Sequence, residues 1–112
     1  MLYIYTANVK DGQLKAFQSW ASKNDERIRK VAPEGWKLRG IYFPVFGFGQ
    51  ALTEIHWDIE NYAAFDAAHR AGSEKGPYFE VVSELYSFLD VKGQSARLLK
   101  EASDSQTLVT AE

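Results

Sequence analysis

The chain of 112 residues contains no cysteine and only three prolines. Without cysteine there can be no disulfide, no thiolate nucleophile and no cysteine-ligated metal. The 13 Lys and Arg residues are scattered among 15 Asp and Glu, which argues against a nucleic-acid groove or a polybasic membrane patch. No apolar run approaches the roughly 20 residues of a membrane span. The first residues lack the basic region of a signal peptide. We therefore expect a cytoplasmic protein with no nucleic-acid and no membrane partner.

Aromatic residues are abundant by contrast, at 14% of the chain, within a hydrophobic content of 46%. This composition and length fit one globular domain with a single core. Aromatic side chains are also enriched at interfaces, so their abundance suggests more apolar surface than one small monomer can cover. We place the domain at residues 1–102 and expect residues 103–112, which are small and polar, to be a disordered tail.

The first half of the chain has clear strand and helix periodicities. Leu2–Val9 is short, β-branched and aromatic and predicts a strand. Apolar residues at spacings of three and four then predict a helix of about 20 residues, with Asp11 as its N-cap and a stop before Gly35. The alternating segments Trp36–Val45 and Ala51–Asp58 predict two further strands.

The Phe46–Gly49 segment predicts the hairpin turn between those strands, because no Gly-Lys-Ser/Thr follows that would indicate a phosphate loop. After it, Asp58 is expected to cap a helix over Ile59–Ala71. A second short helix is expected over Pro77–Ser83, since proline suits a first helical turn. The segment Leu85–Val91 alternates and predicts the final strand.

This β-α-β-β-α-β order is the split βαβ pattern of a ferredoxin-like α+β sandwich with an antiparallel sheet. Helices cover only one face of such a sheet, and a face open to water should be polar. Here both faces of the predicted strands carry large apolar groups. A bare apolar face of that size needs a cover. A second copy packed sheet to sheet about a two-fold axis is the economical one, so we predict a homodimer.

The stretch Glu54-Ile55-His56-Trp57-Asp58, leading into Tyr62-Ala63-Ala64-Phe65-Asp66-Ala67-Ala68-His69, resembles the dimeric α+β barrel proteins. These include the antibiotic-biosynthesis monooxygenase-like, stress-responsive A/B barrel and NIPSNAP-like groups. The resemblance covers nearly the whole chain by element order and about twenty residues by motif. It implies that His56 points into a cavity between two sheets. Because His56 stands where haem-degrading members have Trp, the resemblance to that subgroup is weaker.

Glu54 and His56 are the candidate catalytic pair. Residues two apart on a strand share a face at roughly 7 Å. A regular hairpin would place Ile41 opposite Glu54 and Arg39 opposite His56, gathering three polar groups into one patch. A neutral His beside a carboxylate is a credible general base, and Arg39 could stabilise developing negative charge. The alternative is a structural ion-pair network under the dimer.

Four further residues are expected to line a ligand cavity on the exposed sheet face: Ile41, Phe43, Tyr86 and Phe88. Trp57, on the opposite face from His56, is expected in the core. His69 lies near the apolar stripe of its helix and more often would be a packing residue. We expect no metal site, because no third ligand has recognisable spacing.

Two functions from different classes are consistent with this pattern. The first is a small-molecule-binding protein, which could be a monooxygenase-like enzyme acting on an apolar or aromatic substrate by cofactor-independent oxygenation or proton transfer. No cofactor is expected, since an electron-rich substrate can itself be the reductant in monooxygenases of this kind. The second is a non-catalytic binding or assembly domain, in which the sheet face is only a dimer interface.

Overall fold

The computed structural model describes residues 1–44, 51–71 and 75–103, except the side chains of residues 69–71. The predicted hairpin turn Phe46–Gly49 and the predicted tail beyond residue 103 lie outside the described residues. The elements in chain order are β1 (Leu2–Val9), α1 (Leu14–Val31), β2 (Trp36–Tyr42), β3 (Leu52–Ile59), α2 (Tyr62–Ala71), α3 (Pro77–Tyr86) and β4 (Leu89–Leu99). The strands form one antiparallel sheet in the order β2-β3-β1-β4. The predicted ferredoxin-like α+β class is confirmed.

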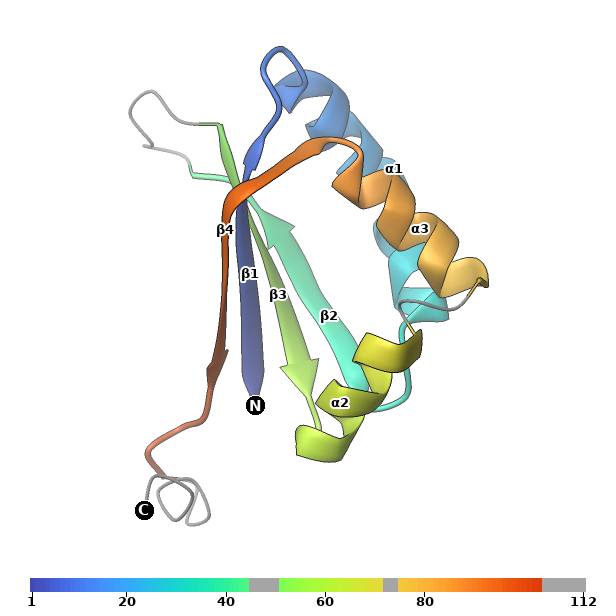
Figure 1. Ribbon diagram of the computed structural model, residues 1–112, viewed down its shortest axis with the longest axis vertical. Coiled ribbons are helices and arrows are strands. Elements are labelled where there is room, and N and C mark those ends of the chain that lie inside the picture. Colours follow the sequence, from blue (N-terminus) through green and yellow to red (C-terminus); the bar gives the residue numbers. More distant parts are fainter. Residues whose placement is uncertain (45–50, 72–74, 104–112) are drawn as a thin grey trace.

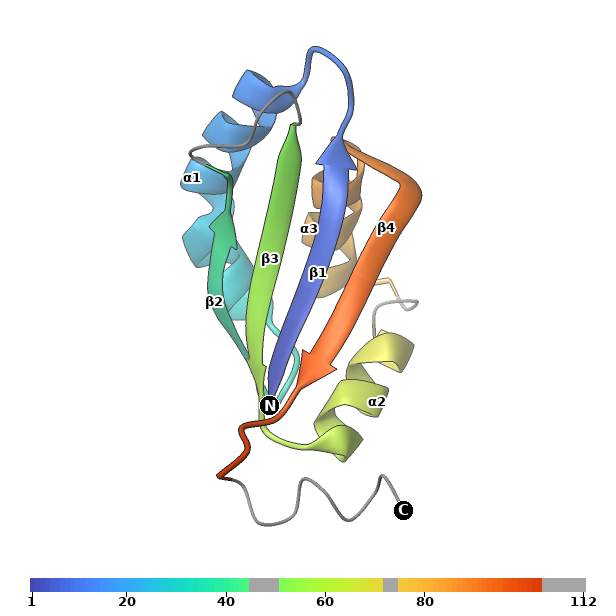
Figure 2. The same ribbon diagram turned by 90° about the vertical axis from the view of Figure 1, so that its left-hand side faces the viewer.

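All three helices lie on one face of this sheet (Figure 1). Helices α1 and α3 pack against each other, whereas α2 lies toward the end where β1 begins and contacts mainly β3. Turning the molecule shows the four strands in front with no helix before them (Figure 2), and we call this side the open face. In the described part of the chain, no helix is long and apolar enough to cross a membrane.

The core fills the space between the sheet and the helices. Tyr5, Ala7 and Val9 alternate along β1 toward it, and Phe17 of α1, which is fully buried, packs over them. Trp57 of β3 is only 6% exposed and belongs to the same cluster, as predicted. Burial of large aromatic side chains on one strand face therefore fixes which side of the sheet the helices cover.

Two predicted helix caps are wrong. Helix α1 begins after Gln13, so Asp11 lies in the preceding turn. Asp58 is still part of β3, and Asn61 caps α2 by accepting a hydrogen bond from the Ala64 backbone N–H at 2.8 Å. In each case the strand or turn continues for two to three residues beyond the first polar residue that could have capped the helix. Helices α1 and α2 therefore begin at the end of these short loops, and not directly after Asp11 and Asp58.

The predicted final strand Leu85–Val91 is present but begins four residues later than predicted, at Leu89. Helix α3 continues to Tyr86, and β4 occupies Leu89–Leu99 instead. Val81 and Leu85 are buried and lie four residues apart, so the helical period places both on the core side of α3. The β4 segment is exposed along most of its length and is held by pairing with β1.

Strand β2 departs from the regular hairpin at Arg39, where the register with β3 shifts. Gly40 pairs with His56, Ile41 with Ile55 and Tyr42 with Glu54. The predicted pairings of Arg39 with His56 and of Ile41 with Glu54 are therefore wrong. One extra residue in a strand moves every later side chain to the other face. Tyr42 thus lies on the open face.

The open face is consequently mixed rather than uniformly apolar. Directly opposed residues of antiparallel strands share a face. The registers place these residues on the open face: Leu2, Ile4, Thr6, Asn8, Lys37, Gly40, Tyr42, Leu52, Glu54, His56, Asp58, Asp90, Ser95, Arg97 and Leu99. Ile4, at its centre, is 6% exposed, while Tyr42 and Leu99 on the two edge strands are 47% and 40% exposed. The open face is therefore less apolar than the sequence pattern predicts.

Candidate functional site

Glu54 and His56 meet on the open face. His56 Nε2 lies 2.8 Å from Glu54 Oε1, within hydrogen-bond distance. The ring of Tyr42 lies against the imidazole with 4.5 Å between ring centroids. The His56 side chain is 21% exposed and that of Glu54 is 44% exposed. The two residues thus form a pair in which the carboxylate can orient the imidazole, leaving the second ring nitrogen for other partners.

Arg39 does not join this pair. Its Nε lies 3.2 Å from Asp58 Oδ2, and both side chains are about half exposed. Because of the shift in β2, Arg39 is not the residue opposite His56. A different basic residue, Arg97 of β4, lies opposite Ile4, which in turn lies opposite His56. Arg97 therefore shares the row of His56 across the open face.

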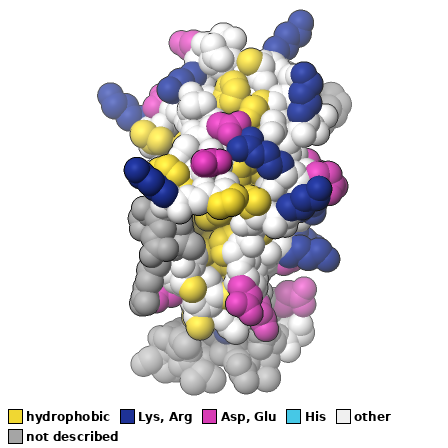
Figure 3. Space-filling view, turned by 90° about the vertical axis from the view of Figure 1, so that its right-hand side faces the viewer, with side chains coloured by type: hydrophobic (Ala, Val, Ile, Leu, Met, Phe, Trp, Pro, Cys, Tyr) yellow, Lys and Arg dark blue, Asp and Glu magenta, His cyan; other side chains and the backbone are white. Residues whose placement is uncertain are grey.

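A second candidate site lies on the helix-covered face, between the sheet and helices α2 and α3. It is a cavity of about 310 Å³ that we call the aromatic cavity. Its aromatic walls are Tyr3, Tyr5, Trp36, Trp57, Tyr78 and Tyr86. Aliphatic side chains that include Val82 and Leu85 of α3 complete it. On this side of the molecule, hydrophobic side chains show down the middle, with acidic and basic side chains both among them and at the flanks (Figure 3).

Trp36 connects α2 to this cavity. Its indole N–H donates to the Ala64 carbonyl at 2.8 Å, and its ring stacks on Phe65 with 5.8 Å between centroids. Trp36 also makes edge-to-face contacts with two other residues of the cavity wall. The distances between ring centroids are 5.6 Å to Tyr3 and 5.3 Å to Trp57. Edge-to-face pairs of this kind stabilise aromatic clusters beyond their buried area. Trp36 is thus both a wall of the cavity and one attachment of α2 to the sheet.

The phenols of the cavity remain protonated over the physiological range. Burial, with a smaller contribution from nearby Tyr3, raises the pKa of Tyr78 to about 12. Burial likewise raises the pKa of Tyr3 and Tyr5 above the ordinary tyrosine value, and it raises that of Tyr86 strongly. These hydroxyls are therefore neutral groups that can donate a hydrogen bond.

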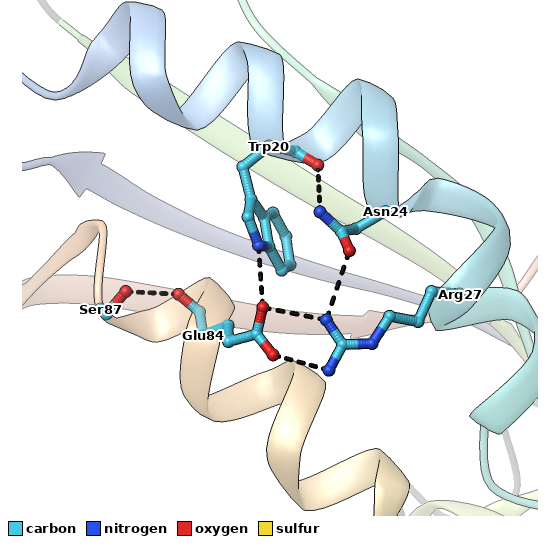
Figure 4. A network of polar contacts seen from close by, with 5 residues as sticks. All are labelled: Trp20, Asn24, Arg27, Glu84 and Ser87. Atoms are coloured by element: carbon cyan, nitrogen blue, oxygen red, sulfur yellow. Dashed lines mark hydrogen bonds and ion pairs between the residues drawn. The ribbon is translucent and has the colours of Figure 1, made fainter.

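A polar network fixes α3, and with it Tyr78 and Tyr86, against α1 (Figure 4). Arg27 donates to both carboxylate oxygens of Glu84, at 2.9 and 2.6 Å. The Trp20 indole N–H adds a third bond to Glu84 at 3.2 Å, and Asn24 bridges Arg27 to the Trp20 backbone. Hydrogen bonds from Arg27, and then from Trp20, hold the pKa of Glu84 below its ordinary value. The wall of the cavity formed by α3 is thus tied to α1 by side chains outside the cavity.

Of the four residues predicted to line a ligand cavity, only Tyr86 lines the aromatic cavity. Phe43 and Phe88 pack on Phe17, at 5.6 and 5.4 Å between ring centroids. Ile41 and Phe43 also line a more polar hollow of about 420 Å³ between α1 and β2. A third hollow, of about 470 Å³, lies where β1 begins and includes Arg39 and Asp58. None of these three hollows includes Glu54 or His56.

Sequence reasoning did not select the cavity as a site. Of its aromatic walls, only Tyr86 is among the residues predicted to line a ligand cavity, because the strand register that decides the face of each tyrosine cannot be read from the sequence pattern. Trp36 is not among the predicted site residues. Its neighbour Gly35 is the residue that could have indicated the cavity. Its φ of +82° and its close packing on Ala64 bring α2 against this end of the sheet.

No family model matches the sequence, and a search of curated proteins gives no significant match. Solved structures do share its fold. An uncharacterised NIPSNAP domain protein from Burkholderia xenovorans is 14% identical, with a TM-score of 0.66, and the match covers 91% of this chain and 95% of the other. A NIPSNAP family protein from Agrobacterium tumefaciens is 10% identical, with a TM-score of 0.70 and coverage of 95% and 96%.

A candidate antibiotic biosynthesis monooxygenase from Nitrosomonas europaea is 12% identical, with a TM-score of 0.60 and coverage of 92% and 90%. The resemblance expected from the sequence is confirmed at the level of the fold. At such low identity the likeness extends to the fold alone, and function has to be argued from the sites.

Proposed function

We propose that this protein binds a small apolar or aromatic molecule in the aromatic cavity. The observation that carries the proposal is a space of about 310 Å³ lined by six aromatic and several aliphatic side chains of the sheet, α2 and α3. Ligand pockets of small molecules start at about this size and are mostly apolar with a few polar groups. The proposed cavity is on the helix-covered face, in place of the open face expected from the sequence.

The test is to fill the cavity from α3. Val82 is half-buried and lines it, whereas the next residue, Ser83, is exposed on the same helix. Val82→Phe should weaken the binding of 2-acetonaphthalene, measured by isothermal titration calorimetry, at least about tenfold, because the added ring occupies the space that the ligand needs. Ser83→Phe should bind it as the wild type does. Unchanged affinity in Val82→Phe, or no binding by the wild type, contradicts the proposal.

A second candidate function is proton transfer by Glu54 and His56 on the open face. It is favoured by the 2.8 Å contact between the carboxylate and Nε2, which leaves Nδ1 as the candidate proton acceptor. The chemistry we propose here acts on an activated carbon acid, by either proton transfer or oxygenation without a cofactor, and a candidate antibiotic biosynthesis monooxygenase shares the fold. Arg39 is less suited to stabilise the resulting charge, since it is paired with Asp58.

This second function can be tested by deuterium exchange at the α-carbon of 2-tetralone, followed by proton NMR. The wild type should accelerate the exchange and His56→Ala should not, while Arg39→Ala should retain most of the effect. If the acceleration survives in His56→Ala, His56 is not the base.

We also propose that two copies associate through their open faces. Tyr42 and Leu99 expose large apolar side chains on the two edge strands of this face, with Ile4 between them. A second copy would cover these groups and enclose Glu54 and His56. Sedimentation velocity should therefore show a dimer that Leu99→Arg weakens. Tyr62→Arg, at an exposed tyrosine of α2, is the matched control and should leave the dimer intact. A monomeric wild type at tens of micromolar would contradict this proposal.

A further inference from the structure

The cavity contains more hydrogen-bonding capacity than an apolar ligand needs. Four of its aromatic walls are tyrosines, on β1 and α3. Tyr5 has its own partner, because its hydroxyl donates to the Gln94 side-chain carbonyl of β4. In the described part of the chain, the hydroxyls of Tyr3, Tyr78 and Tyr86 make no hydrogen bond to protein groups. Three phenol donors thus remain available at one site.

These hydroxyls lie near one another. Tyr3, Tyr78 and Tyr86 line the same cavity of about 310 Å³. After burial, which is the main cause, nearby Tyr3 also raises the pKa of Tyr78, and the neighbouring tyrosines also raise that of Tyr86. Tyr86 also packs edge to face on Tyr5, with 5.6 Å between ring centroids. A group of neutral O–H donors within an apolar cavity favours a ligand atom that accepts a hydrogen bond without a full charge.

The absence of charge among the described lining residues further restricts the class of ligand that the cavity can bind. Among the described residues that line the cavity, none is charged. A carboxylate ligand would lose its hydration there without gaining a cationic partner, and this desolvation costs more than neutral phenols return. An aromatic wall can also hold a quaternary ammonium ion, but here no described lining residue supplies the counter-charge.

We propose that the hydroxyls of Tyr3, Tyr78 and Tyr86 determine specificity by selecting an uncharged aromatic ligand that presents a carbonyl or similar acceptor oxygen. This inference rests on the proposed binding function of the aromatic cavity. It adds which residues discriminate between ligands and what they require of them. The aromatic walls would bind any flat apolar ligand, and the tyrosine hydroxyls would favour those ligands that carry a hydrogen-bond acceptor.

The experiment uses four probes that share one ring system: 2-acetonaphthalene, 2-ethylnaphthalene, 2-naphthoate and a 2-naphthyltrimethylammonium salt. By isothermal titration calorimetry, the ketone should bind about three- to tenfold more tightly than the hydrocarbon, the range that one net hydrogen bond gives. The two charged probes should bind more weakly than either. Tyr78→Phe and Tyr86→Phe should each lower ketone affinity toward that of the hydrocarbon and leave hydrocarbon affinity unchanged.

Tyr62→Phe is the matched control, since Tyr62 is exposed on α2 and does not line the cavity. It should change neither affinity. Equal binding of ketone and hydrocarbon overturns the specificity proposal while leaving the binding function intact, provided that Val82→Phe weakens the binding of both. Tighter binding of the naphthoate or the ammonium probe overturns it as well. If none of the four probes binds, the proposed function itself fails.

Discussion

Gly35 offers a sharp test of how α2 is attached to the sheet. It precedes β2 with φ of +82°, and its carbonyl accepts a hydrogen bond from the Glu60 backbone N–H at 2.9 Å. A Cβ at this position would lie 2.7 Å from the Ala64 Cβ of α2. Gly12 has a similar φ of +77°, but a Cβ there would meet nothing within 4 Å. The two glycines therefore separate backbone strain from steric overlap.

The expected magnitudes follow from this difference. Alanine in the left-handed region costs about 1–2 kcal/mol at either position. At Gly35 the overlap with Ala64 adds about 1–3 kcal/mol, the usual cost of overpacking a close contact. Gly35→Ala should thus lower the free energy of unfolding by about 2–5 kcal/mol, against about 1–2 kcal/mol for Gly12→Ala.

Urea unfolding followed by far-ultraviolet circular dichroism measures both variants, with the midpoints compared at equal slope. Hydrogen exchange should also show that Gly35→Ala loosens the amides of α2 more than those of α1, because α2 contacts the rest of the fold mainly at β3. Equal costs for the two variants, or equal loosening of the two helices, would refute the close packing of α2 on Gly35.

Three further predictions address the groups around the cavity. Trp36→Phe should lower the free energy of unfolding by about 0.5–1.5 kcal/mol, because the Ala64 carbonyl loses its indole donor; unchanged urea midpoints and α2 exchange rates would contradict this. Glu84→Gln should destabilise the folded protein at neutral pH by weakening the hydrogen bonds from Arg27. Since the pKa of Glu84 is lowered in the folded state, the difference in stability between wild type and variant should disappear as the pH falls below the ordinary glutamate range. A constant difference in stability between pH 7 and pH 3 argues against the network. Burial raises the pKa of Tyr78 to about 12, so stability should fall as the pH rises above 10.0 toward that value, and by less in Tyr78→Phe; equal alkaline loss in both proteins would contradict the burial of this phenol.

The face assignments of β3 could be read from the sequence because alternation along Thr53–Ile59 is regular. Glu54 and His56 therefore share one face, and Trp57 lies in the core, as predicted. The same reasoning failed in β2, where the register shift at Arg39 moves the following side chains to the other face. A bulge leaves no mark in the hydrophobic pattern itself, so Arg39 was placed beside His56 and is instead paired with Asp58.

The C-terminal third was misread for a different reason. β-branched and aromatic residues of α3 mimic a strand locally, and only the four-residue spacing of Val81 and Leu85 indicates the helix. The polar β4 segment around Gln94 has little strand character of its own and is held by pairing with β1. The aromatic cavity forms where β1, β2, β3, α2 and α3 meet, so no local sequence pattern could have revealed it.

We place the proposed ligand site between the sheet and the helices. Intermolecular nuclear Overhauser effects between bound 2-acetonaphthalene and assigned methyl groups would show whether the ligand lies there. Val82 and Leu85 report on the aromatic cavity, and Ile4 and Leu99 report on the open face. We predict contacts to the methyl groups of Val82 and Leu85. Contacts confined to Ile4 and Leu99 would place the ligand on the open face beside His56 and contradict the claim.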